Sequence, residues 1–387
     1  MPMRVPKGDQ RLLRRHNRGL VLNLLRERGP LSRTELSQRT GLAPSVLTRL
    51  IRDLVAEGVV VESGKAESNG GRRPTLLELN PDYAHVIGLK VERARLLGAR
   101  VDLGGRIRAR AAVDLPEHPR PQRFLELAGQ LAAELLRGKT LGVGIGVSGF
   151  VDAVRGVDLY SPILDWREVP ISEPLARVTG LPVYLENDVN ALTLAERWYG
   201  AGRAFRNFVC VTVGEGIGAG VVIGGELYRG AFGGAGEVGH MTIDPDGPRC
   251  RCGERGCLEV FASDRFLLRR AGELGYPDIG ALAAAARDGD PAAQAAFQDM
   301  GRALGIGVKN LVNLLNPEAV VLGGERMEHQ DLFLPAFEEE VRRHSFPKEA
   351  EILAIERAQL GEDGFLVGAA ALVIREFFRL PTERARV

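Results

Sequence analysis

Three of the four cysteines in the chain lie within eight residues, in the segment CRCGERGCLE. Cys250, Cys252 and Cys257 offer three thiolates, and two glycines between them let the loop fold tightly around an ion. A structural zinc site needs four ligands, usually thiolates and imidazoles, and His240 is the only histidine near the cluster in the sequence. These four residues therefore predict one structural zinc ion. The alternative, a set of small buried cysteines, fits poorly with a loop this polar.

The remaining cysteine and the composition limit the classes of protein to consider. Cys210 lies in the apolar stretch FVCVTVG and is expected in the core. Four cysteines are too few for a disulfide scaffold. The chain has 387 residues, 45% hydrophobic and 26% charged, and shows no long apolar run or secretory signal. We expect a cytoplasmic protein of two or three domains with no membrane association.

The N-terminal segment predicts a helix-turn-helix. LLRRHNRGLVLNLLRERGP is an amphipathic helix that Gly29 and Pro30 stop. A second helix begins after Ser32, with Glu35 completing a capping box, and ends at Gly41 in a left-handed turn. A third helix follows in APSVLTRLIRDLVAEG, and VVVESGKAESNGGRRPTLLELN predicts strand, turn and strand, the form of a wing.

The third helix has one apolar and one polar face. The apolar side chains expected to pack inward are Val46, Leu47, Leu50, Ile51, Leu54 and Val55. The side chains that share the opposite face and can reach a major groove are Ser45, Thr48, Arg49 and Arg52. At the tip of the wing, Arg72 and Arg73 are suited to a narrow minor groove.

Charge supports DNA binding by this segment. Residues 1–80 contain 15 Lys and Arg against 8 Asp and Glu, a net charge of +7, whereas the whole chain carries only +1. The alternative is an ordinary surface helix and an arginine-bearing hairpin without a DNA role. The order of the elements and the net charge together favour a DNA-binding domain over residues 1–82.

From about Tyr83 onward, alternating apolar strands and helices predict an α/β architecture. GVSGFVD, ENDVNALTLAE, GEGIGAG, GGAGEVGH, CRCGERGCLE and NPEAVVLGG occur in the order seen in the ROK family of repressors and sugar kinases, which the chain resembles over residues 11–380. The resemblance implies a two-lobed, actin-like and ribonuclease H-like body behind a winged helix-turn-helix. We expect a small lobe over residues 83–195, joined by a C-terminal helix at about 364–387, and a large lobe over 196–363.

The resemblance also implies a sugar site. Its family positions are Ser148, Gly149, Asn187, Asp188, Glu237, His240 and Glu259. Cys257 lies two residues before Glu259 and His240 three after Glu237, so closing the zinc site would fix both carboxylates, which accept strong hydrogen bonds from hydroxyl groups. Helix capping is the alternative role of Asn187 and Asp188, and the two roles are compatible.

The phosphate-binding positions depart from those of the kinase branch. There Asp188 would act as general base, and an Asp-x-Gly-Gly-Thr turn follows the first strand. This chain instead has IGLKVERARL, with Lys90 at the aspartate position, and Glu215 replaces the usual Thr in GEGIGAG. A carboxylate there repels a triphosphate. The sequence therefore predicts a vestigial nucleotide site and no catalytic residue, with Asp188 only a vestigial base.

The leading interpretation is a sugar-responsive repressor of carbohydrate-metabolism genes that binds operator DNA as a homodimer or homotetramer. The alternatives are an ATP-dependent, zinc-containing sugar kinase with an added N-terminal domain, and a DNA-binding protein whose body serves only dimerisation. Glucose, xylose, N-acetylglucosamine and phosphorylated sugars all remain open as effector, which can act as inducer or corepressor.

Overall fold

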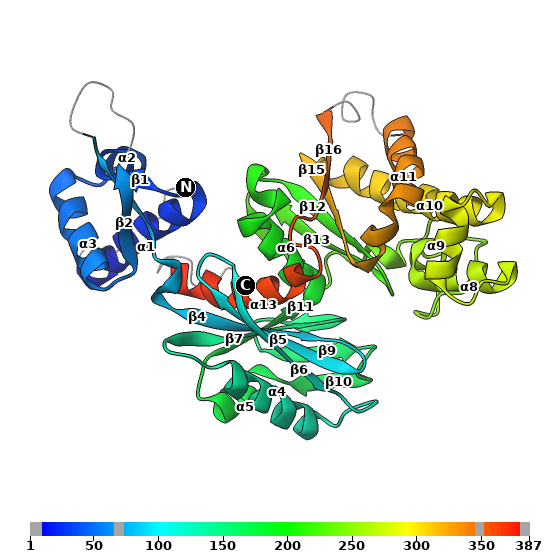
Figure 1. The fold of residues 1–387 in the computed structure, drawn as a ribbon, viewed down its shortest axis with the longest axis horizontal. Helices are drawn as coiled ribbons and strands as arrows, with labels where there is room; N and C mark the ends of the chain where they lie inside the picture. The colour runs from blue at the N-terminus through cyan, green and yellow to red at the C-terminus, as the bar shows by residue number, and fades with distance from the viewer. Residues whose placement is uncertain (1–9, 66–72, 345–351, 380–387) are drawn as a thin grey trace.

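The computed structural model describes residues 10–65, 73–344 and 352–379. It has three parts (Figure 1): a small N-terminal domain at the left, a lobe below the centre and a larger lobe at the right. Within the described residues, no helix is long and apolar enough to cross a membrane. The N-terminal domain comprises α1 (Gln10–Arg28), β1 (Leu31–Ser32), α2 (Arg33–Thr40), α3 (Pro44–Ala56), β2 (Val60–Lys65) and β3 (Thr75–Leu79).

Local sequence signals set the boundaries of this domain. The Ser32 side chain accepts a hydrogen bond from the Glu35 backbone, the Glu35 carboxylate accepts one from the Ser32 backbone, and α2 ends at Gly41 with φ 68°. The predicted capping box and left-handed end are therefore confirmed. The strands pair in the order β1-β3-β2, so the predicted wing hairpin forms the edge of a three-stranded sheet.

The predicted inner face of α3 is partly wrong. Leu47, Ile51 and Leu54 are buried, but Val46 is 44% exposed and Val55 is 38% exposed. Successive helical residues are separated by about 100° around the axis, so a residue next to the buried stripe falls on its margin. The core of this small domain covers only the central stripe of α3.

The first lobe is built on a five-stranded sheet with the order β11-β7-β4-β5-β6. β4–β5–β6 is an antiparallel meander, and β7 and β11 add to it in parallel. Its elements are β4 (His85–Val91), β5 (Arg95–Asp102), β6 (Ile107–Asp114), α4 (Pro121–Leu135), β7 (Thr140–Val147), β8 (Phe150–Asp152), β9 (Val157–Ser161), β10 (Trp166–Pro170), α5 (Ser172–Thr179), β11 (Val183–Asn187) and α6 (Asp188–Tyr199).

The second lobe repeats the same strand arrangement in the order β14-β13-β12-β15-β16, again a meander extended by two parallel strands. Its helices gather at the far right of Figure 1. Its elements are β12 (Phe208–Val213), β13 (Ile217–Ile223), β14 (Glu226–Tyr228), α7 (Glu259–Ala262), α8 (Asp264–Leu274), α9 (Ile279–Arg287), α10 (Pro291–Leu315), β15 (Ala319–Gly323), α11 (Gln330–His344) and β16 (Ala354–Arg357).

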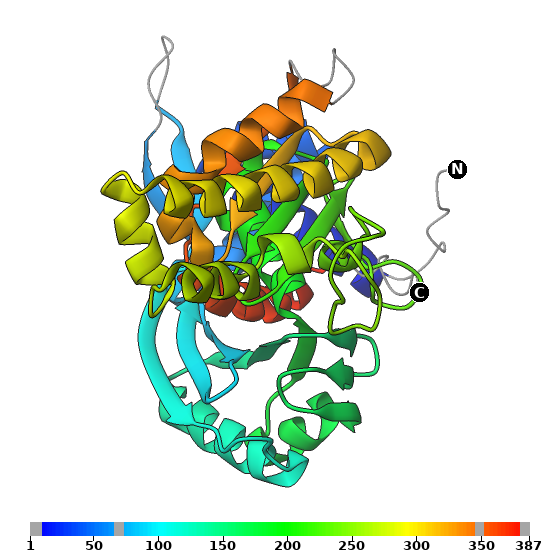
Figure 2. The same cartoon turned by 90° about the vertical axis from the view of Figure 1, so that its right-hand side faces the viewer.

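The C-terminal helix α13 (Asp363–Phe378) returns to the first lobe and lies between its sheet and α6, as both views show (Figures 1 and 2). Glycines on two strands permit this close packing, because a Cβ at Gly88 or Gly144 would lie 2.1 or 1.8 Å from a carbonyl oxygen of α13. Side chains of α13 also join one apolar core with those of α1 and α3, so the N-terminal domain packs directly on the body.

Candidate functional site

The cysteine-rich loop brings four metal-ligand atoms together. His240, Cys250, Cys252 and Cys257 place these atoms within 4.8 Å of one another. Cys250 Sγ lies 3.6 Å from His240 Nδ1, and Cys252 Sγ lies 3.6 Å from Cys257 Sγ. Gly256 (φ 66°) allows the loop to close, since a Cβ there would lie 1.5 Å from the Asp244 carbonyl oxygen. The cluster can hold a metal ion. Cys210 lies apart from it, fully buried in β12.

Two carboxylates extend from the ends of this loop. Glu237 immediately precedes the short helical turn that ends at His240, and Glu259 begins α7 two residues after Cys257. Glu259 is 4% exposed and forms an ion pair with Arg251, with Glu259 Oε1 3.0 Å from Arg251 Nε. Sequence reasoning missed Arg251. Its position between two predicted metal ligands was the signal, because the loop that fixes those cysteines also fixes the residue between them.

The opposite wall comes from the first lobe. Asn187 caps α6, its Oδ1 accepting from the Asn190 backbone at 3.0 Å, while its Nδ2 donates to the Gly149 carbonyl at 3.0 Å. Gly149 has φ 109°, and a Cβ there would lie 2.1 Å from a carbonyl oxygen, so this turn with Ser148 requires glycine. Asp188 is the first residue of α6. The capping role considered for Asn187 is therefore present, and it also ties the helix to the Ser148–Gly149 turn.

The carboxylates of the two walls influence one another across the space between the lobes. Burial raises the pKa of Asp188 above its ordinary value, and the nearby Lys90 ammonium opposes this. Burial also raises the pKa of Glu237, and the charges of Asp188 and Glu259 raise it further. The site therefore concentrates negative charge and hydrogen-bond acceptors, a composition suited to a ligand with several hydroxyl groups.

The neighbouring region, where the two lobes present corresponding β-turns, is occupied by ion pairs. Arg93, in the β4–β5 turn, lies 2.6 Å from Glu215 in the β12–β13 turn, measured from Nη2 to Oε1. Lys90 on β4 lies 3.2 Å from Glu92, 3.6 Å from Glu325 and 4.2 Å from the Phe365 ring. The residues that depart from the kinase pattern thus bind one another across the lobes.

A second candidate surface lies on the N-terminal domain. Ser45, Thr48, Arg49 and Arg52 of α3 are all exposed, and Arg73 is exposed beside the wing. The Thr48 hydroxyl donates to the Pro44 carbonyl at 2.8 Å, so it is already engaged within the helix. Arg72 lies outside the described residues. A groove of about 200 Å³ between α2 and α3 adds side chains that the sequence did not single out, namely Arg33, Thr34, Ser37 and Gln38.

Helix α6 joins the first-lobe wall of the candidate site to the N-terminal domain. It begins at Asp188 and ends beside α1, where the Arg26 guanidinium stacks 4.1 Å above the Trp198 ring. Nearby, Asn23 Nδ2 donates to the Phe378 carbonyl at 2.8 Å, joining α1 to α13. Sequence reasoning missed this junction, because Arg26 and Trp198 are remote in sequence and each matches an ordinary amphipathic helix.

Comparison with known proteins agrees with both parts of this architecture. A family model described as "Winged helix-turn-helix DNA-binding" matches residues 14–61, and the ROK family model matches residues 86–376. A putative xylose repressor of Caldicellulosiruptor sp. (strain Rt8B.4) is 34% identical, with 97% of this chain and 99% of the relative covered.

Two solved structures extend the comparison. A ROK family transcriptional regulator, described as a homologue of the E. coli MLC protein, has a TM-score of 0.81 at 30% identity, covering 95% of this chain and 97% of the other. A ROK family glucokinase from Streptomyces griseus, in complex with glucose and AMPPNP, has a TM-score of 0.66 at 33% identity. The match covers 74% of this chain and 98% of the glucokinase. The regulator thus matches the whole architecture and the kinase its body, and the chain belongs to the ROK family.

Proposed function

We propose that this protein is a cytoplasmic repressor of carbohydrate-metabolism genes whose affinity for operator DNA is controlled by a sugar bound between the lobes. Helix α6 carries the proposal, since the charge of its first residue, Asp188, acts on Glu237 of the second lobe and its last turn supports Arg26 of the DNA-binding domain. The repressor among the relatives supports it, and so does the glucose complex of the related kinase.

The proposed sugar site combines Ser148, Gly149, Asn187 and Asp188 of the first lobe with Glu237, His240 and Glu259 of the second. A ligand held from both sides favours the closed arrangement of the lobes, and only such a difference in affinity moves the equilibrium. Movement of α6 and α13 would reorient the winged helices. In a homodimer or homotetramer this changes the spacing of two domains that must reach operator half-sites about one helical turn, or a multiple, apart.

We propose zinc as the ion of the cysteine loop. A tetrahedral zinc ion with Zn–S distances of about 2.3 Å places its ligand atoms roughly 3.5–3.8 Å apart, and the two ligand distances of 3.6 Å agree with this geometry. Three sulfur donors and one imidazole also match its preferred ligands. When bound, zinc would cross-link the loop, so that His240 and Cys257 fix the positions of Glu237 and Glu259.

The kinase alternative is weaker on the same geometry. Phosphoryl transfer requires a preorganised cradle for the ATP phosphates and their metal ion. Here the Arg93–Glu215 ion pair joins the two turns, and Lys90 replaces the aspartate of the kinase branch. We infer that the protein does not transfer phosphoryl groups, although Asp188, the base of the kinase branch, is present.

Fluorescence anisotropy with DNA from the region upstream of its own gene tests the proposal. A panel of hexoses, pentoses and amino sugars is titrated with and without ATP. We expect one sugar to change operator affinity at least tenfold, a coupling of about 1.4 kcal/mol, in the absence of ATP. A sugar that binds tightly and leaves operator affinity unchanged would contradict the proposal. An effect that requires ATP would favour the kinase.

The role of α6 is tested separately by Trp198→Leu, which removes the aromatic support of Arg26. We expect sugar affinity and sugar-free operator affinity to persist while the effect of sugar on operator affinity falls severalfold. Arg18→Met is the control on the same helix, because the Arg18 side chain pairs with Glu57 within the DNA-binding domain at 2.6 Å. Equal loss of coupling in both variants would refute the role of α6.

A further inference from the structure

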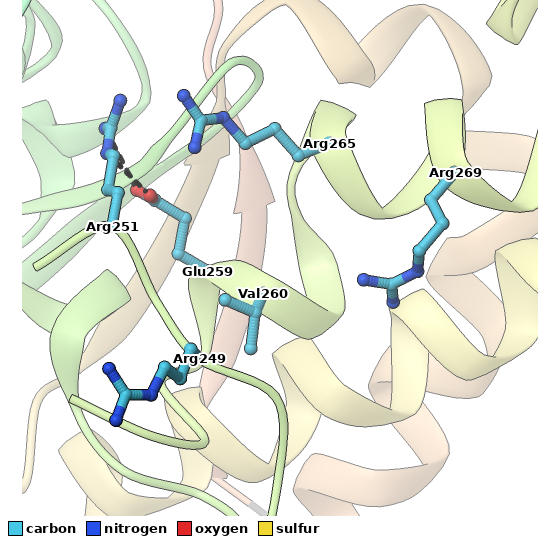
Figure 3. A pocket seen from close by; sticks show the side chains of 6 residues that line it. All are labelled: Arg249, Arg251, Glu259, Val260, Arg265 and Arg269. Atoms are coloured by element: carbon cyan, nitrogen blue, oxygen red, sulfur yellow. Dashed lines mark hydrogen bonds and ion pairs between the residues drawn. The ribbon is translucent and has the colours of Figure 1, made fainter. Parts of the chain in front are cut away.

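A small cavity on the second lobe is lined mainly by arginines. It encloses about 130 Å³, and its lining, here named the arginine pocket, comprises Arg249, Arg251, Glu259, Val260, Arg265 and Arg269. Figure 3 shows the Arg251 and Arg265 guanidinium groups on either side of the Glu259 carboxylate, with Arg249 and Arg269 flanking Val260. The sugar site includes Glu259, but the four arginines have no part in it.

Two rigid elements position these arginines. Arg249 and Arg251 flank Cys250 in the metal loop, so the geometry of the loop fixes both of their backbones. Arg265 and Arg269 are four residues apart on α8, which places them on one face of that helix. Arginines from two separate segments of the chain therefore line the same cavity.

The positive charge of the pocket is largely uncompensated. Glu259 is the only acidic residue of the lining, and Arg251 already pairs with it. Arg249 and Arg265 form no ion pair with any carboxylate in the described parts of the chain, and Arg269 lies 3.9 Å from Glu273, outside the lining. Two of the four guanidinium groups, those of Arg249 and Arg265, thus have no carboxylate partner among the described residues, so the natural occupant of the cavity is an anion.

We propose that the arginine pocket binds a phosphate monoester beside the sugar. Guanidinium groups bind phosphate through paired hydrogen bonds, and a phosphate accepts several such pairs from different sides. Sites for drug-sized ligands enclose roughly 300–1,000 Å³, so this cavity fits a phosphate group and excludes a nucleotide. DNA bound to α3 is also excluded, since α8, which carries Arg265 and Arg269, and α3 lie at opposite ends of Figure 1.

The position of the pocket suggests how the phosphate would affect the sugar. A Cβ at Gly216 would lie 3.0 Å from Glu259 Oε2 and 3.5 Å from Arg251 Nη2, so the pocket borders the β12–β13 turn. A phosphate competes with Glu259 for Arg251 and thereby releases that carboxylate for sugar hydroxyls. This inference rests on the proposed sugar site and identifies the effector chemistry as a sugar with a phosphate.

Calorimetry and phosphorus NMR with inorganic phosphate test the pocket directly, in the full-length protein without sugar. The test variant Arg265→Ala/Arg269→Ala leaves the metal loop intact, and we expect it to weaken phosphate binding by at least about tenfold. The control Arg270→Ala/Arg302→Ala removes the same charge from residues that pair with Glu273 and Asp299 at 2.7 and 2.8 Å. Unchanged phosphate affinity in the test variant, or equal loss in the control, overturns the proposal.

Sugar titrations then identify the source of the phosphate. Stronger binding of glucose 6-phosphate than of glucose, lost in the test variant, would place the phosphate on the sugar. Glucose affinity that rises with added inorganic phosphate, and only in proteins with the pocket intact, would support a separate phosphate. No preference and no enhancement would refute the coupling to sugar. If phosphate binds but no sugar changes operator affinity, the phosphate site is supported and the proposal of a sugar-controlled repressor is refuted.

Discussion

The charged residues at the two ends of the contact region between the lobes interact in opposite ways. At one end, the corresponding turns of the two similar sheets carry Arg93 and Glu215, which bind each other at 2.6 Å. At the other end, burial raises the pKa of Glu237, and the charges of Asp188 and Glu259 raise it further. Arg93 and Glu215 already satisfy each other's charge, whereas crowded carboxylates can still accept hydrogen bonds from a ligand. The contrast supports the proposal that the acidic end, here called the sugar end, binds the sugar, whereas at the other end, here called the phosphate end, the Arg93–Glu215 pair joins the lobes.

The largest expected effect comes from removing one proposed metal ligand from the cysteine-rich loop. Cys252→Ala is expected to release the metal and to weaken sugar binding more than about a hundredfold, because structural zinc sites contribute roughly 10 kcal/mol or more to local folding. Cys252 is exposed, so the change leaves the apolar core intact. Metal content and calorimetry measure both effects, with Cys210→Ala as the control that retains the metal. Sugar affinity that survives metal loss would separate the two sites.

Asp188→Asn tests whether the crowded carboxylates at the sugar end lower the stability of the sugar-free protein. Sugar affinity should fall at least tenfold, a loss of about 1.4 kcal/mol, when a charge-assisted hydrogen bond becomes a neutral one. Thermal stability without sugar should rise at neutral pH. The folded pKa of Asp188 is raised, so the folded state holds a proton that the unfolded state has lost, and stability falls as pH rises through that interval. A lower unfolding midpoint at pH 7 would contradict this reasoning.

A buried carboxylate outside the proposed sugar site tests how much burial of such a group lowers stability. Asp158 on β9 is fully buried, and burial raises its pKa from 3.8 to about 7, although the Tyr160 backbone N–H opposes this shift. Stability from this group is greatest below pH 4 and falls as pH rises to about 7. Asp158→Asn should therefore stabilise the protein at pH 8 by on the order of 1–3 kcal/mol, with little effect at pH 4 and none on sugar affinity.

The smallest expected effect is at the phosphate end. Both members of the Arg93–Glu215 pair are about half exposed, so a double-mutant cycle of Arg93→Ala and Glu215→Ala should give a coupling of about 0.2–1 kcal/mol in urea unfolding. Neither single variant should bind ATP, since the glycine turn of the kinases is still missing. Nucleotide binding in either variant would show that the pair, rather than the lost turn, blocks the site.

The accuracy of sequence-based prediction differs among these features for physical reasons. The capping box at Ser32 and the turn at Gly41 were predictable, because capping depends on residues three or four apart. Clustering of Cys250, Cys252 and Cys257 followed from their short spacing. The inward orientation of Val46 and Val55 was wrong, since helical periodicity gives the direction of the buried face but not its width.

The sequence by itself determined the classes of element and the residues that carry chemistry, because capping, turn formation and metal-ligand spacing are local properties of the chain. Tertiary structure alone decided three associations: Arg93 with Glu215, 122 positions apart in the sequence, Arg26 with Trp198, and the arginines of α8 with those of the metal loop. Each joins side chains from different elements. Their proximity arises from the packing of sheets and helices, which no short segment of sequence encodes.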